Sequence, residues 1–385
     1  MGKTWLTAIF VLVTGCHICG YAESDFELDG HVKYLQTVLV PDTGDDWLLS
    51  AEPRARLELS WYPGSVVSFR VGVQNRLIVG EFVEDLFNFR QLLDEGDRLL
   101  DMSWNIVEGN SYVLNVMVDR AYAAVDIDPV RLRLGRMRVN WGLNLVWNPN
   151  DLFNAESFFD FATEVAPGMD GVELTVYLGP TSSVQMVAEA RSEIDSTNFA
   201  ALYRFNTWGY DFQVLGGMVA SDIVIGGGWT GSIGGAAFRG EATYFHPRPD
   251  FGSEWGQLVA SVSSDYTFGN SLYIQGSVLL NSTGTTGKAG TTEAVIREEL
   301  SVKDLTPALG SLFGQVRYPF TPLFQGDLAT IVNPFDGSFV VLPTLSYSLT
   351  QTIDLLAGGQ LFFGRDGTEF GNIGHIGYGW LLWSF

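Results

Sequence analysis

The feature that most constrains this chain is a two-residue alternation of apolar and polar side chains that recurs along most of its length. Leu57, Leu59 and Trp61 alternate with charged or hydroxyl side chains, and segments 68–74 and 130–134 repeat the pattern. Such a period marks a β-strand with one apolar and one polar face. A soluble sandwich turns the apolar face inward, whereas a membrane barrel turns it outward to lipid. The alternation alone leaves both folds open.

Composition favours the membrane barrel. Charged residues make up only 17% of the chain, against about 25% in soluble domains. Aromatic residues reach 13%, and 44 of the 385 residues are glycine. The 22 basic and 44 acidic residues give a net charge of −22, which argues against a nucleic-acid-binding protein because such a protein needs a basic face.

The first 22 residues predict export. Lys3 precedes a short apolar stretch, and Gly20 and Ala22 are small residues at the −3 and −1 positions of a cleavage site. This is the pattern of a secretory signal peptide, cleaved near Ala22 after Sec-type export. Segment 13–16 also resembles a lipobox, so lipidation of Cys16 is an alternative. Cleavage near Ala22 leaves one domain, 23–385, without cysteine.

Turn signals separate the alternating segments and predict an antiparallel up-and-down transmembrane β-barrel of about 18 strands, with 16 as the alternative. Long and short connections alternate, as in a barrel with short turns on one rim and long loops on the other. The pair 292–301 and 307–318 is the least defined, because its first member also fits a short helix, and 319–335 is expected to be a long loop. The predicted strands are 26–40, 52–62, 64–78, 111–125, 129–141, 171–179, 182–192, 196–205, 209–220, 222–231, 234–245, 256–265, 270–281, 292–301, 307–318, 336–347, 351–363 and 373–385.

The last strand carries the most specific signal for the outer membrane. It alternates and ends on Phe385, with the aromatic Trp383 two residues earlier. This ending resembles the C-terminal signature that the bacterial barrel-assembly machinery reads. Trp383 and Phe385 are expected at the periplasmic membrane interface, where aromatic belts form. We therefore expect contact with outer-membrane lipid and lipopolysaccharide in a Gram-negative bacterium.

A hairpin at residues 117–154 resembles a motif of porin-like barrels. Its strand GRMRVNWG, residues 135–142, is similar to the GRQ-x-x-x-WG strand of alginate-export-type and related outer-membrane families. A DRAY segment precedes this strand and an NP-x-D loop follows it, as in those families, but Met137 replaces the usual Gln. The resemblance implies a barrel that passes a small or polymeric polar solute. It does not identify that solute. Porin-like barrels occur as monomers or trimers, so the resemblance is compatible with a homo-oligomer.

Arginines on this hairpin predict a charged lumen. Arg131 and Arg133 share one strand face, and a one-residue bulge at Gly135 would keep later polar side chains on that face. An arginine on the lipid face at mid-bilayer costs about 2–4 kcal/mol, so these side chains are expected to face the lumen. The predicted basic wall consists of Arg70, Arg120, Arg131, Arg133, Arg136, Arg138 and Asn140, with Arg54 and Arg56 beside them.

Acidic loops are expected to face this wall. Asp151, Glu156 and Asp160 are predicted to line the passage opposite the arginines. Opposed charges across a narrow passage orient dipolar solutes. Segment 142–170 is too rich in Leu, Trp and Phe for a freely solvated loop, so it is expected to fold inward and narrow the pore. An outer cap, or arginines that pair with acids only for stability, is the alternative.

Catalytic and metal-binding chemistry finds little support in the sequence. His31, His246 and His375 lack metal-ligand spacing, and no Ser-His-acid arrangement stands out. We therefore expect no enzyme activity, no metal and no cofactor. The sequence predicts a porin-like outer-membrane channel for small polar solutes. The alternative is a non-conducting surface or export component that binds a polysaccharide or a partner protein.

Overall fold

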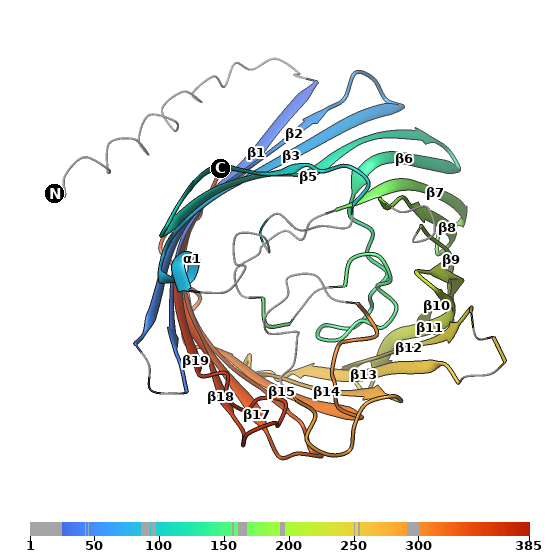
Figure 1. Ribbon diagram of the computed structural model, residues 1–385. Helices are drawn as coiled ribbons and strands as arrows, with labels where there is room; N and C mark the ends of the chain where they lie inside the picture. Colours follow the sequence, from blue (N-terminus) through green and yellow to red (C-terminus); the bar gives the residue numbers. More distant parts are fainter. Residues whose placement is uncertain are drawn as a thin grey trace.

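The described residues form one closed antiparallel sheet, seen along the barrel axis in Figure 1. The computed structural model describes residues 25–42, 44, 46–85, 93, 98–155, 158–160, 168–192, 197–249, 251–252, 255–290 and 301–385. The sheet has 19 strands, and all of them except β4 make up a closed ring of 18. The predicted signal peptide, 1–22, lies outside the described residues.

The ring closes where the first strand pairs with the last. His31 lies opposite Ser384, and Val40 lies opposite His375, so the two histidines occupy opposite ends of the seam. The strands of the ring are β1 (Phe26–Val40), β2 (Leu48–Trp61), β3 (Val67–Gly80), β5 (Tyr112–Ile127), β6 (Val130–Met137), β7 (Met169–Gly179), β8 (Ser182–Glu189), β9 (Asn198–Thr207), β10 (Tyr210–Val219), β11 (Asp222–Ile233), β12 (Ala236–Pro247), β13 (Gln257–Thr267), β14 (Tyr273–Asn281), β15 (Gly310–Pro319), β16 (Phe324–Val332), β17 (Phe339–Ser348), β18 (Ile353–Phe363) and β19 (His375–Ser384).

Two further elements lie at one end of the barrel. The helix α1 (Glu81–Asp85) follows β3, and β4 (Ser103–Gly109) pairs with residues 112–117 of β5. β6 pairs with residues 121–127 of β5, so β4 and β6 share one edge of that strand at different heights. In the part of the chain that the structure describes, no helix is long and apolar enough to cross a membrane.

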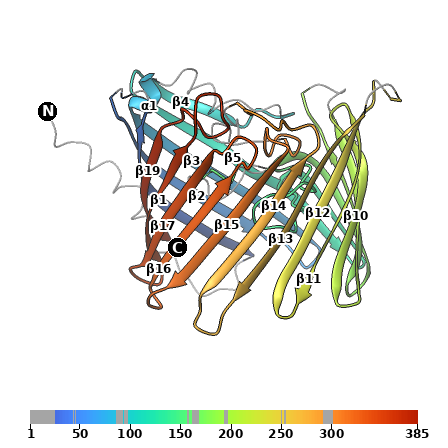
Figure 2. The same cartoon turned by 90° about the horizontal axis from the view of Figure 1, so that it is seen from below.

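Connections of unequal length separate the two ends of the barrel. The end that carries α1 and β4 also holds the connections 138–168, 282–309 and 364–374. The opposite end has shorter turns, such as 234–235 and 320–323. Figure 2 shows the short turns at the lower end of the barrel and α1 at the upper end. We call these the short-turn end and the long-loop end.

The outer surface of the barrel is apolar. On β14, Ile274, Val278 and Leu280 are 39–52% exposed, while the intervening Gln275 and Ser277 are buried inside. This alternation is what a strand between lipid and lumen requires. The predicted all-β barrel of 18 strands is therefore confirmed.

One pair of predicted strands is wrong. β14 pairs directly with β15, so no strand lies between them in the wall. Most of the predicted strand 292–301 lies outside the described residues. The segment 319–335, expected to be a loop, contains β16, which pairs along its whole length with β15 and β17. The strand predicted at 307–318 exists as β15, but it runs in the opposite direction to that expected.

The apolar exterior predicts how the barrel responds to a new charge. Val316 on β15 faces outward beside Ile274 and Leu328. Val316→Arg should lower the free energy of unfolding from lipid vesicles by about 1–3 kcal/mol, because an arginine on the lipid face between the bilayer midplane and the interface loses much of its water. The neighbouring Gln315 faces inward, and its Nε2 donates to Asp327 Oδ2 at 2.8 Å. Gln315→Arg is the matched control and should change stability much less in urea unfolding.

Candidate functional site

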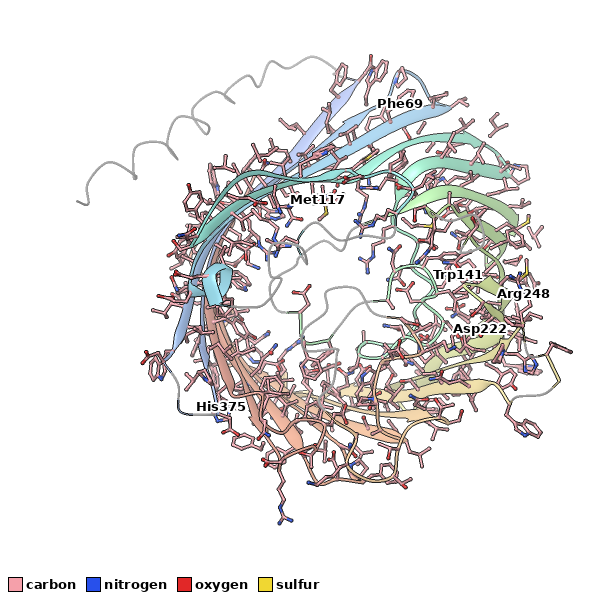
Figure 3. All side chains as sticks on the ribbon, in the orientation of Figure 1. Phe69, Met117, Trp141, Asp222, Arg248 and His375 are labelled. Carbon is pink, nitrogen blue, oxygen red and sulfur yellow. The ribbon has the colours of Figure 1, made fainter. Side chains whose placement is uncertain are left out.

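A segment between β6 and β7 leaves the wall and enters the barrel. The chain departs after Met137 and rejoins the wall at Met169, opposite the residue where it left. Figure 1 shows this stretch inside the ring, and Trp141 is labelled within it in Figure 3. We call its described residues, 138–155 and 158–160, the inward segment.

A single buried carboxylate holds the inward segment against β12. Glu241 is 1% exposed and accepts backbone N–H bonds from Leu143, from Asn144 at 2.8 Å and from Asn150 at 3.0 Å. These three donors come from a tight irregular turn, where backbone N–H groups lack partners within a strand or helix. A carboxylate satisfies several donors at once, and such charge-assisted bonds are stronger than neutral ones.

Side-chain amides of the same turn fix it to the neighbouring strands. Asn150 Nδ2 donates to the Gly227 carbonyl at 3.0 Å, and its Oδ1 accepts from Thr243 Oγ1 at 2.7 Å. Asn144 Oδ1 accepts from Ser263 Oγ at 2.6 Å. The turn is therefore bonded to β11, β12 and β13 together.

The glycines of β11 allow this close approach. A Cβ atom on Gly228 would lie 3.0 Å from Leu143 Cδ1 and 3.1 Å from Asn150 Nδ2. A larger residue at this position would push the inward segment off the wall. The Gly226–Gly228 run of β11 thus includes a docking position for the inward segment.

Trp141 ties the start of the inward segment to the wall. Its indole Nε1 donates to Gln185 Oε1 at 2.8 Å, and its carbonyl accepts from Gln213 Nε2 at 2.8 Å. Its backbone N–H donates to Asp151 Oδ1 at 3.1 Å. Asp151, predicted to line the passage, is 4% exposed and bonds within the segment.

The far end of the inward segment reaches the opposite wall. Gln360 Nε2 on β18 donates to the Phe159 carbonyl at 2.7 Å, and the ring of Phe159 lies 6.1 Å from that of Phe362. Trp147 packs edge-on against Phe313 of β15. Inward-facing apolar side chains from β8 to β18 complete one buried cluster around the segment. The barrel therefore contains a hydrophobic core on one side of its interior.

Paired charges line the other side. Arg56 Nε donates to Asp119 Oδ2 at 2.6 Å, and Arg76 Nε lies 2.8 Å from Glu52 Oε1, which also pairs with Arg54. Most arginines of β2 and β3 thus have an acidic partner within the wall.

A cavity of about 530 Å³ opens beside these strands. Arg70, Arg131, Arg133 and Arg204 line it, against the two carboxylates Asp126 and Glu173. The other lining side chains are mostly hydroxyls, amides and phenols, namely Ser60, Tyr62, Ser68, Tyr122, Thr175, Tyr177, Ser183 and Gln185, with Phe69 and Ala124. The cavity is polar and carries more positive than negative side chains.

Two lumenal arginines differ from the rest. Among the described residues, neither Arg120 nor Arg204 lies in an ion pair within 4.0 Å of a carboxylate oxygen. Arg120 Nη1 donates to the Asp119 carbonyl at 2.8 Å, and Arg204 Nη2 lies 3.4 Å from the Asn140 carbonyl. Both side chains therefore bond to neutral carbonyl oxygens. Arg204 lines the cavity, whereas Arg120 is buried and lies outside it.

Arg136 lies in a junction of the wall rather than on the cavity. It is 2% exposed, its Nε and Nη2 reach the Asp170 carboxylate at 2.7 and 2.8 Å, and its Nη1 donates to the Val118 carbonyl. The predicted bulge at Gly135 is absent, since β6 stays in register with β5 and β7 through this residue. Gly135 has a φ of +124° instead.

The remaining predicted residues are scattered around the inward segment. Arg138 and Asp160 are half-buried, Asn140 is exposed, and Glu156 lies outside the described residues. Trp383 and Phe385 lie at the short-turn end, with their ring centroids 5.1 Å apart. Phe385 exchanges two backbone hydrogen bonds with Gly30.

Sequence reasoning missed Arg204 and Glu241. Each lies on an otherwise ordinary alternating strand and meets the inward segment from 64 or more residues away. The local signal that could have identified Glu241 is a lone Glu inside a Gly- and Ala-rich strand. No group of three or more His, Cys, Asp or Glu side chains that could hold a metal exists among the described residues.

Comparison with known proteins gives a likeness of fold. No protein-family model and no curated protein matches the sequence. The outer membrane protein OprD from Pseudomonas aeruginosa matches with a TM-score of 0.61 at 8% identity, covering 94% of each chain. OccAB1 of Acinetobacter baumannii matches at 0.60 and 12% identity over 95% of this chain and 97% of that one. Pseudomonas aeruginosa OpdK with vanillate matches at 0.57 and 10% identity, over 93% and 98%. The chain is thus similar in fold to outer-membrane proteins over nearly its whole length.

The contacts of Glu241 predict the effect of removing it. Glu241→Ala would leave three buried N–H groups without an acceptor and should lower the free energy of unfolding by about 2 kcal/mol or more. Hydrogen exchange of the amides of Leu143, Asn144 and Asn150 should accelerate. Glu27→Ala, which removes an exposed carboxylate of β1, is the control. Unchanged protection of the three amides would contradict the assigned role.

Proposed function

We propose that the protein is an outer-membrane channel for small polar solutes, with a preference for anions. The observation that carries the proposal is the arginine-lined cavity beside the inward segment. Four arginines and two carboxylates line that cavity, in a chain whose net charge is −22. Concentrating positive charge inside a negative protein attracts anionic solutes to that path.

The inward segment supports a single route through the barrel. Its hydrophobic packing against β8–β18 occupies one side of the interior, whereas β3 and β6 carry three of the four cavity arginines and β9, at the border of the two sides, carries Arg204. A solute would then pass along the arginine side, where hydrogen-bond donors and charge replace its lost water. The inward segment is the constriction in this proposal. The side chains that would line the passage beside it are Arg70, Arg131, Arg133, Arg138, Asn140, Asp160 and Arg204.

Similar structures support the same solute class. The structure of OpdK with vanillate pairs a barrel of this fold with an aromatic carboxylate. The hairpin's resemblance to alginate-export-type barrels supports a channel and favours no particular solute. An anion of small size fits both the cavity volume and its charge.

The last strand supports assembly in the outer membrane. Phe385 is 47% exposed beside Trp383, at the end where the short turns lie. Exposed aromatic rings at the ends of strands suit the membrane–water interface. We propose that this strand contacts lipid and is recognised by the barrel-assembly machinery through Phe385, which puts the long-loop end outside the cell.

Selectivity measurements test the channel. The mature chain, 23–385, in a planar bilayer should give open steps whose reversal potential in a salt gradient shows anion preference. Arg204→Gln should lower the anion-to-cation permeability ratio about twofold or more, because this cavity-lining arginine lacks a paired acid. Arg248→Gln, at an exposed position outside the cavity, is the matched control.

A correctly folded barrel without conductance would overturn the channel proposal. It would favour the alternative, a non-conducting surface or export component that binds a polysaccharide or a partner protein. If the wild-type channel prefers cations and the cavity substitution leaves that preference unchanged, the channel function stands and the role of the cavity arginines is rejected.

Deletion tests the constriction separately. A variant lacking residues 150–166 should conduct about twofold more than the intact chain, because the passage widens. The unheated variant should still migrate on a gel differently from the heated one, which shows that the 18-stranded wall still closes. Unchanged conductance in a folded deletion variant would count against the constriction.

A further inference from the structure

Three connections at the long-loop end meet at one buried acid. Glu369, in the connection 364–374, is 2% exposed. Its Oε1 accepts from Thr306 Oγ1 at 3.2 Å, and its Oε2 accepts from Asn333 Nδ2 at 3.0 Å. Thr306 belongs to the connection 282–309 and Asn333 to the connection 333–338. One carboxyl group therefore joins three loops that are far apart in sequence.

Asp336 is the charged group that faces this acid. The backbone N–H of Glu369 donates to Asp336 Oδ2 at 2.8 Å, so the second carboxylate lies against the same turn. Hydroxyls of Ser338 and Ser311 complete the cluster through Asp336 and Thr306.

The two lysines among the described residues of these loops are engaged elsewhere. Lys288 donates to the carbonyl of Asp366, and Lys303 lies 2.7 Å from Asp222 on β11. Arg365, Asp366 and Asp304 are exposed. Within the described residues, Glu369 forms no ion pair with a basic side chain.

The loop cluster rests directly on the inward segment. The ring of Phe370, the residue after Glu369, lies 6.0 Å from the ring of Phe159. Leu305, the residue before Thr306, belongs to the same buried cluster as Phe159 and Trp147. Movement of these loops would therefore remove packing from the end of the inward segment at β18.

We propose that Glu369 is the proton-sensing residue of a latch that holds the three loops closed over the inward segment when it is protonated and loosens them when it ionises. The effect on the passage rests on the channel function proposed above. The effect on the loops does not.

The titration of Glu369 gives the direction. Burial, helped by the negative charge of Asp336, raises the pKa of Glu369 to about 7, although the hydrogen bonds from Thr306 and Asn333 oppose the rise. Asp336 stays ionised, because bonds from Ser338 and from backbone N–H groups hold its pKa below the ordinary value despite burial. A raised pKa in the closed state means that the latch is fully stable below about pH 4.5 and weakens as pH rises through about 7.

Hydrogen exchange measures the latch without requiring conductance. The amides of 301–309 and 333–338, in the full mature chain in lipid, are compared at pH 6 and pH 8 after correction for intrinsic exchange. A carboxyl pKa of 4.5 in the open loops and about 7 in the closed loops predicts about tenfold more opening at pH 8. Glu369→Gln mimics the protonated acid without its charge, since the amide oxygen can accept from Asn333 and the amide nitrogen can donate to Thr306 Oγ1, and it should abolish this difference. Asp366→Asn, an exposed acid of the same loop, should keep it.

Single-channel recording at the same pH values separates the two proposals. Wild type should conduct more at pH 8 than at pH 6, and Glu369→Gln should not. Exchange that is equal at both pH values in wild type, or a step that persists in Glu369→Gln, overturns the latch. Absence of conductance at every pH, with the exchange step intact, overturns the channel and leaves the latch. An exchange step without a conductance step rejects the coupling between them.

Discussion

The interior of this barrel depends on one buried carboxylate that satisfies backbone N–H groups. The turn at 143–150 can leave the wall only if its N–H groups find acceptors, because an unpaired buried N–H costs about 1–3 kcal/mol. Glu241 provides three of those bonds from a single position on β12. Once the turn is fixed there, the direction in which the rest of the inward segment crosses the lumen follows from its aromatic residues.

The aromatic residues of the inward segment determine which side chains the wall must turn inward. A water-filled barrel needs polar side chains facing inward, but Phe245, Phe313 and Phe362 face inward here and bury the inward segment. From β8 to β18 each strand therefore carries at least one inward apolar side chain, such as Leu279 on β14, among its inward polar ones. On β2 to β6 the inner face stays polar and charged. The asymmetry of the lumen thus follows from which side chains occupy the inward positions of each strand.

Much of the fold could be predicted from alternation and turn residues, because each strand has two chemically different faces. The approach failed at β16, where Gly326 interrupts the outer apolar face and Pro322 precedes the strand, so the segment resembles a loop. It also assigned a strand of the wall to 292–301, since a short run of this kind fits a strand and a helix alike. Pairing of β14 with β15 is a long-range fact that local pattern does not contain.

The positive charge of the candidate site could be predicted from the sequence, but the contacts of its residues could not. The arginine content of β6 gave the basic wall, but the burial of Arg136 depends on the Leu100 and Val118 carbonyls, supplied by other segments of the chain. In the same way, Arg204 and Glu241 acquire their roles only when the inward segment reaches them.

Pairing decides which lumenal charges can act on a solute. Arg56 and Arg76 face carboxylates at hydrogen-bond distance, so their fields are largely cancelled a few ångströms away. Arg204 lines the cavity and bonds to a neutral carbonyl, which neutralises no charge. A wall of many arginines therefore acts on a passing anion mainly through the few that lack an acid. The paired majority hold the strands in register and fix the geometry in which those few are presented.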